Sequence, residues 1–392
     1  MKATRHLLSV VLFLLLVACA GKGPFWNKFQ GDVLNRARGG KPIAVGKVRF
    51  KKSLPGPAFL GGPALWSGPG YNGYNDSRLI LGLGISGLGS LVPLQGNLVG
   101  QFTTENTIST YPAIRRSGEE SPTIFFSTVG GDVFCVSGDL NKQVWHTKLP
   151  SGNVLVTSPT FWGRRVFVGA DRYFYSLNAD TGAIVWTKRM DSDVFYDAAP
   201  PILVDSPDEA VIGCTADGTV IKLKTEDGSV LWQQKIDSPY ISGNAMIGKD
   251  WSVFIPGSDG VLYVLAASDG HVSWKLKNID GTALTGVALS EDFKSAYYAT
   301  HAGVLSVVNV DTHTRKWSIT LPAPPTTPPI IAENETIYLG IGNTYANAAV
   351  VAAGRDGIKW SVPVSIGLVN HLAVGEDGSI YAVAGHDLIA IN

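Results

Sequence analysis

The side chains that could bind a metal or carry out catalysis are scattered along this sequence. Six histidines follow the N-terminal segment, and no two of them have the i, i+4 spacing of a helical metal-binding pair: His146, His271, His301, His313, His371 and His386. Asp191, Asp193 and Asp197 are grouped, but the glycine and the terminal glutamate of a calcium-binding loop are missing. We therefore expect no catalytic residues, no metal and no cofactor, unless the fold brings distant histidines together.

Two further patterns have a chemical and a structural interpretation. Gly82, Gly84 and Gly87 have the spacing of a dinucleotide-binding loop, but the residues after them form a β-hairpin pattern and not the helix that a phosphate requires. Cys135 and Cys214 lie in strand-like surroundings about 80 residues apart, without zinc-ligand spacing. We expect two buried free thiols.

The N-terminus predicts export. Lys2, Arg5 and His6 precede an apolar run of eleven residues, 7–17, which is too short to span a bilayer as a stable helix. We interpret 1–18 as a signal peptide. Leu16-Val17-Ala18-Cys19 resembles a bacterial lipobox, in which Cys19 is lipidated, whereas Ala18-Cys19-Ala20 also fits ordinary cleavage.

The compartment follows from which of these two cleavages applies. Lipidation of Cys19, with Ala20 rather than Asp after it, predicts a protein anchored to the periplasmic side of the outer membrane, with 19–44 as anchor tether and leader. Ordinary cleavage predicts a secreted or soluble periplasmic protein.

Composition favours an all-β protein. Of 392 residues, 45% are hydrophobic and only 16% are charged, against about 25% in average globular proteins. The 45 Gly, 22 Pro, 13 Tyr and 10 Trp favour short strands and tight turns over amphipathic helices. Basic and acidic residues balance at 32 each, so we expect no nucleic-acid partner.

A repeated tryptophan defines the unit of the fold. Gaps of 41, 46, 42, 43 and 43 residues separate Trp145, Trp186, Trp232, Trp274, Trp317 and Trp360. In 218–232, 260–274 and 303–317, a glycine lies fourteen residues before the tryptophan, and alternating apolar residues with a turn between them predict a hairpin. Two more strand-like runs precede each hairpin. Four strands in about 43 residues are typical of one β-propeller blade.

The repeat also gives the number of blades. One period before Trp145 lies Phe102, which we interpret as a degenerate copy of the tryptophan. The last unit stops at Asn392 without its fourth strand, which 45–50 could supply, closing the ring from the N-terminal side. We predict one eight-bladed propeller over 45–392, with seven blades as the alternative, and expect the repeated aromatic side chains to pack between neighbouring blades.

The segment from Asn178 to Trp186 resembles the docking motif of PQQ-like (pyrroloquinoline-quinone-like) β-propeller repeats, and the resemblance extends over 84–392. Quinoprotein dehydrogenases share this repeat, which implies a quinone-dependent oxidoreductase as one alternative and an exported ligand-binding propeller as another. Their adjacent cysteine pair is absent here. The chain is more similar to the BamB family of outer-membrane barrel-assembly lipoproteins in its lipobox, length and blade number.

The BamB resemblance implies a non-catalytic scaffold, tethered to the membrane by its N-terminal lipid. Its partners would be envelope proteins, including the barrel-assembly machinery, and the chain would be a monomer within that complex. In this family a loop ahead of the blade that ends in Trp232 contacts the partner through exposed Leu and Arg. The matching residues are Val194, Phe195 and Tyr196, which are apolar but include no Arg. The alternative is that Phe195 and Tyr196 are buried in a strand.

Overall fold

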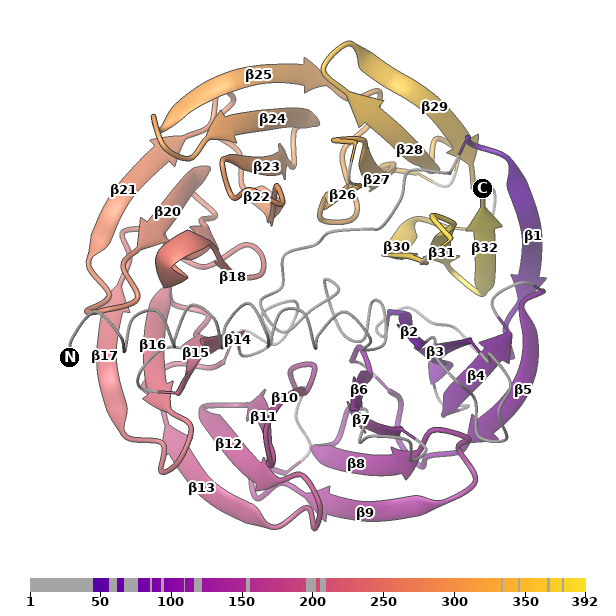
Figure 1. The fold of residues 1–392 in the computed structure, drawn as a ribbon, viewed down its shortest axis with the longest axis vertical. Coiled ribbons are helices and arrows are strands. Elements are labelled where there is room, and N and C mark those ends of the chain that lie inside the picture. Colours follow the sequence, from indigo (N-terminus) through magenta and orange to yellow (C-terminus); the bar gives the residue numbers. More distant parts are fainter. Residues whose placement is uncertain are drawn as a thin grey trace, which may run out of the picture.

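The protein is a closed ring of eight antiparallel sheets, each with four strands (Figure 1). The computed structural model describes residues 45–392 apart from 56–61, 67–76, 85–86, 93–94, 109, 116–121, 153–155, 195–201, 205–208, 333, 345, 365–366 and 376. The predicted eight-bladed propeller is therefore confirmed, and the seven-bladed alternative is excluded. Everything predicted for residues 1–44 lies outside the described residues.

The blades follow one another along the chain, each running from an inner to an outer strand. Blades 1 to 4 consist of β2 (Ala64–Trp66), β3 (Arg78–Gly82), β4 (Leu88–Val92) and β5 (Asn97–Phe102); β6 (Ala113–Arg115), β7 (Thr123–Ser127), β8 (Asp132–Ser137) and β9 (Gln143–Lys148); β10 (Thr160–Trp162), β11 (Arg165–Ala170), β12 (Tyr173–Asn178) and β13 (Ile184–Arg189); and β14 (Ile202–Val204), β15 (Ala210–Cys214), β16 (Thr219–Lys224) and β17 (Val230–Lys235).

Blades 5 to 8 repeat the pattern, and a short 3₁₀ turn (Lys249–Trp251) lies in blade 5. Their strands are β18 (Met246–Ile247), β19 (Val253–Pro256), β20 (Val261–Leu265) and β21 (Val272–Lys277); β22 (Leu284–Leu289), β23 (Ser295–Thr300), β24 (Val304–Asn309) and β25 (Thr314–Thr320); β26 (Ile330–Ile331), β27 (Ile337–Ile341), β28 (Ala349–Gly354) and β29 (Gly357–Pro363); and β30 (Val369–Val374), β31 (Ile380–Ala384), β32 (Asp387–Ile391) and β1 (Val48–Ser53).

Burial differs between middle and outer strands. Every residue of β23 is buried, because both faces of a middle strand lie against neighbouring blades. In β25 exposed and half-buried residues alternate, since one face of this outer strand points to solvent. The low charge content of the sequence follows from this packing, because charged side chains are costly to bury.

The two ends of the described chain meet in blade 8. β1 pairs antiparallel with β32 and forms the outermost strand of that blade, beside the C-terminus (Figure 1). Lys47 and Asn392 exchange two backbone hydrogen bonds of 2.8 Å. The Arg49 guanidinium donates to the Tyr381 hydroxyl at 2.8 Å and forms an ion pair with Asp377. The prediction that an N-terminal strand closes the ring is confirmed.

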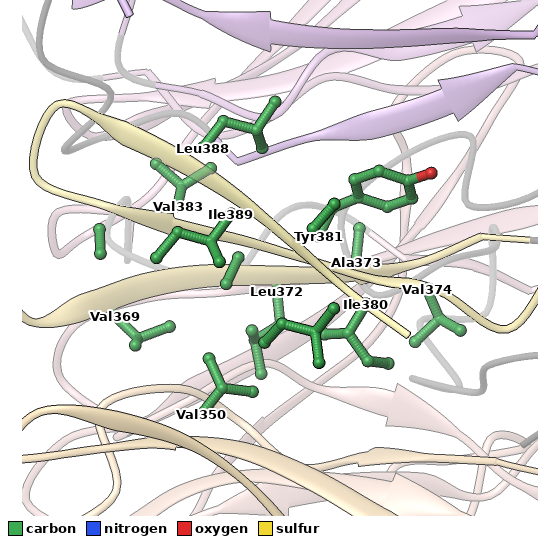
Figure 2. Packing of buried hydrophobic residues seen from close by; sticks show 14 of the residues in the cluster. Val350, Val369, Leu372, Ala373, Val374, Ile380, Tyr381, Val383, Leu388 and Ile389 are labelled. Atoms are coloured by element: carbon green, nitrogen blue, oxygen red, sulfur yellow. The ribbon is translucent and has the colours of Figure 1, made fainter. Parts of the chain in front are cut away.

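The core is distributed between the blades. In blade 8, Leu372, Ile380 and Ile389 pack together, and Val350 from blade 7 joins them (Figure 2). Each blade therefore buries its apolar faces against its neighbours, and the ring has to close before the first and last blades are covered.

Candidate functional site

Tryptophans from the outer strands dock each blade onto the next. Each of the six lies directly after a β-bulge. Trp145, Trp186 and Trp232 lay their indoles over the turn between the third and fourth strands of the following blade. The indole N–H of each of these three donates to a backbone carbonyl in that turn: Trp145 to Ala179 at 2.9 Å, Trp186 to Thr225 at 2.9 Å and Trp232 to Ala267 at 2.8 Å.

A turn glycine in the left-handed region makes this contact close. Gly182, Gly228 and Gly270 have φ of +73°, +71° and +77°, and a Cβ on any of them would lie 2.5–2.8 Å from the indole. Since L-residues are strained at such φ and a methyl group has no room there, glycine is required on both counts.

The remaining tryptophans meet different partners. Trp274 stacks on His313, the residue in place of the turn glycine, with ring centroids 4.5 Å apart. Trp360 packs against Gly46, just before β1, so residues from opposite ends of the chain meet at the last junction. Trp317 faces blade 7, where this turn has only two residues, Arg355 and Asp356.

Phe102, interpreted as a degenerate copy of the tryptophan, packs against the next blade but does not stand at the tryptophan position. The bulge in β5 places Gly100, not Phe102, opposite Ser90, the pairing that Trp145 makes with Cys135 in blade 2. Phe102 lies two residues further on and makes edge contacts with Phe126 and Phe134. Counting by period failed because blade 1 has no aromatic residue at the docking position.

Phe50 in β1 is the aromatic residue that sequence reasoning missed. It follows the β1 bulge, and a Cβ on Gly96 of blade 1 would lie 2.5 Å from its ring. The spacing Gly46-x-x-x-Phe50 matches Gly182-x-x-x-Trp186 and was the available signal.

The junction between blades 1 and 2 reverses the sizes of the two contacting residues. Gly100 stands at the position that Trp145 has in blade 2, and the buried Leu140, with φ of +61°, lies opposite it, one residue before the place of the turn glycine. A Cβ on Gly100 would lie 3.9 Å from that of Leu140 and 3.1 Å from the Asp139 carbonyl oxygen. Leucine thus fills the space that an indole occupies elsewhere.

The residues predicted to contact a partner are only partly described. Val194 is 1% exposed, forms a bridge with Thr215 and packs against Gly169. Its prediction as a partner contact is therefore wrong, because the first residue after Asp193 turns into the blade core. Phe195, Tyr196 and the lipidation residue Cys19 lie outside the described residues.

The cysteines and the glycine-rich segment considered for chemistry are parts of the β-sheet framework. Cys135 and Cys214 are free and buried, as predicted, and burial raises the pKa of each thiol to about 12. Gly82, Gly84 and Gly87 precede strand β4, as expected from the hairpin pattern. Within the described ranges, no group of three or more His, Cys, Asp or Glu side chains could hold a metal ion.

Carboxylates stabilise loops on the ring. Asp132 accepts hydrogen bonds from His146 at 2.9 Å and Asn106 at 3.1 Å and pairs with Lys148. Burial alone would raise the pKa of Asp132, but these hydrogen bonds and the lysine charge together lower it. Asp193 pairs with Arg172 at 3.0 Å. These contacts are typical of structural ion pairs.

The bulge residues on the outer strands divide the ring into two halves. In blades 1 to 4 these residues are apolar and 39–52% exposed. We call them the apolar rim: Val99, Val144, Val185 and Leu231. In blades 5 to 8 the same position holds a polar or charged residue: Ser273, Lys316, Lys359 and Arg49. Blades 1 to 4 are neighbours in the ring (Figure 1). Four adjacent blades therefore present apolar side chains to solvent at equivalent positions.

The profile of the family described as outer membrane protein assembly factor BamB matches residues 87–239 and 197–392. The chain belongs to this family. The BamB of Yersinia pestis is 23% identical over 193 residues, a match that covers 46% of this chain and 48% of that protein. The chain thus spans about half the length of the relative it matches.

Solved structures share the fold. The crystal structure of BamB from Moraxella catarrhalis superimposes with a TM-score of 0.67 at 16% identity, covering 88% of this chain and 99% of that one. The crystal structure of the computationally designed Ika8 protein superimposes with a TM-score of 0.68 at 15% identity, covering 87% of this chain and 98% of that one. The crystal structure of Sqt1 from Saccharomyces cerevisiae superimposes with a TM-score of 0.70 at 13% identity, covering 89% of this chain and 98% of that one. At these identities the likeness concerns the fold alone. Among the described residues, no helix is long and apolar enough to cross a membrane.

Proposed function

We propose that this protein is a non-catalytic scaffold of the bacterial envelope, tethered to the outer membrane through Cys19, that takes part in outer-membrane protein assembly. Membership of the BamB family supports assembly as the process. The observation that carries the proposal is the apolar rim, since exposed apolar side chains at the same place in four adjacent blades favour a protein-binding edge. Docked blades hold that edge rigid, so a partner can bind it without an ordering cost.

Charge at the rim tests the proposal directly. The double substitution Val185→Lys and Leu231→Lys places two cations on the exposed edge of blades 3 and 4. We expect at least a tenfold loss of affinity for the barrel-assembly proteins, because lysine cannot be desolvated there without a partner charge. Ser273→Lys is the matched control, since it adds a cation at the same bulge position on the polar half.

The measurement is quantitative co-purification from detergent-solubilised envelope, with thermal unfolding to show that each variant folds. Equal recovery of barrel-assembly proteins by the rim and control variants would contradict a binding role for the rim.

The tether has a separate test. Cys19→Ala removes the lipidation site, and we expect the variant to leave the membrane fraction after a salt wash. Retention of the variant in that fraction would contradict the lipid anchor.

A further inference from the structure

A depression of about 630 Å³ opens at the seam between blades 6 and 7 on the polar half of the ring. We call it the seam pocket. Residues of the outer strand and of two turns of blade 7 line it, together with Lys316 and Trp317 of blade 6. Its volume lies within the range of small-molecule sites.

The pocket exists because one turn is short. The turn between the third and fourth strands has four to six residues in blades 1 to 6, but only Arg355 and Asp356 in blade 7. In blades 3 to 6, a glycine or His313 from this turn covers the preceding tryptophan. A Cβ on Gly357 would meet nothing within 4 Å, so this turn stops short of covering Trp317.

The indole of Trp317 is left with unused binding capacity. Unlike Trp145, Trp186 and Trp232, it has no acceptor for its N–H and no stacked ring among the described residues. That N–H is not among the buried unpaired polar atoms of the described chain, so water reaches it. Trp317 therefore lines the pocket with an indole whose N–H is not used by the described residues.

Polar groups of both signs surround this indole. The ammonium groups of Lys316 and Lys359 are held at 2.7 Å by the hydroxyls of Ser295 and Thr336 and retain further donors. Arg355 adds more donors, while the carboxylates of Glu335 and Asp356 and the amide of Asn334 add acceptors.

This combination selects a class of ligand. A purely apolar ligand would remove the charged groups from water without compensation, and a polyanion would meet the two carboxylates. A pyranose ring presents a flat C–H face to the indole and hydroxyls that both donate and accept around its edge. We propose that the seam pocket binds a saccharide chain, with one pyranose ring lying on Trp317. The pocket and the apolar rim lie on opposite halves of the ring, so failure at one is distinguishable from failure at the other.

Isothermal titration calorimetry of the purified protein with two probes, the N-acetylglucosamine trimer and maltotriose, tests the proposal. We expect saturable binding of at least one probe and a loss of about tenfold or more in affinity for Trp317→Ala, because the stacked ring is removed. Trp317→Phe keeps an aromatic face without the N–H donor and should bind with intermediate affinity. Glu226→Ala, in the equivalent turn of blade 4, is the matched control and should bind like wild type.

A second variant keeps the test valid if Trp317→Ala fails to fold. Replacing Arg355, Asp356 and Gly357 by the five-residue turn 225–229 of blade 4 gives blade 7 the spacing of blade 4, brings a glycine over Trp317 and fills the pocket without altering the tryptophan. Loss of binding in this variant supports the proposal. Failure of wild type to bind either probe, or equal binding by wild type and the turn variant, overturns it.

Discussion

Gly270 provides a direct measure of how tightly the blades dock. In Gly270→Ala the new methyl carbon would lie 2.5 Å from Cε3 and 2.8 Å from Cδ2 of Trp232, at a backbone φ of +77°. An L-residue at such φ costs about 1–2 kcal/mol. Forcing the indole away costs a further ~1–3 kcal/mol, because it also strains the 2.8 Å hydrogen bond from Trp232 to the Ala267 carbonyl. The expected loss of unfolding free energy is therefore ~2–5 kcal/mol.

Gly281→Ala separates the two contributions. Gly281 has φ of +69°, but a Cβ there would meet nothing within 4 Å. The unfolding free energy of this control should fall only by the ~1–2 kcal/mol that an L-residue costs at such φ. Equilibrium urea unfolding, followed by tryptophan fluorescence, measures both variants against wild type at unchanged denaturant dependence. Equal destabilisation of the two would refute the claim that the turn glycine is required by contact with the tryptophan.

Three further predictions concern ring closure, the reversed junction and pH. Phe50→Ala should lower the unfolding free energy by at least ~2 kcal/mol and speed hydrogen exchange of the β1 amides, because it removes the contact of β1 with blade 1. Phe102→Ala should leave hydrogen exchange in β1 unchanged. Gly100→Trp should destabilise the protein by ~1–3 kcal/mol through overpacking against Leu140. Adding Leu140→Gly should restore stability in a double-mutant cycle. Free-energy changes of the two substitutions that simply add would contradict the size reversal. Burial alone would raise the pKa of Asp217, but hydrogen bonds from Lys235 and two threonines lower it more, so that it falls from 3.8 to about 2. Because this pKa is lowered in the folded state, wild type should be more stable than Asp217→Asn above pH 3.8 and should lose that advantage as the pH falls towards 2. The difference should be less than ~1 kcal/mol, since the Asp217 side chain is 38% exposed. A difference in urea midpoint that does not change with pH would count against this assignment.

The family to which the chain belongs does not by itself locate its binding surfaces. A designed protein and a yeast protein superimpose on it as well as a bacterial BamB does. Blade geometry is set by strand pairing and interblade packing, which many sequences satisfy. Binding depends instead on bulge residues and turns that the packing leaves unconstrained, such as Val185 in the apolar rim and Arg355 in the seam pocket.

The sequence by itself determined the all-β class, the eight-fold repeat, the closure by 45–50 and the buried state of both cysteines. These features follow from local patterns, because alternation, turn residues and a tryptophan every 41–46 residues are written within single blades. The glycine-rich segment at Gly82 could likewise be assigned to a hairpin from its neighbours.

Only the tertiary structure decided which residues meet between blades. A bulge in β5 moved the docking position from Phe102 to Gly100, and ring closure brought Gly46 to Trp360 and Phe50 to Gly96. A bridge to Thr215 buried Val194. Such contacts join residues up to 314 positions apart (360 minus 46), and their register depends on the closed ring, which no local pattern encodes.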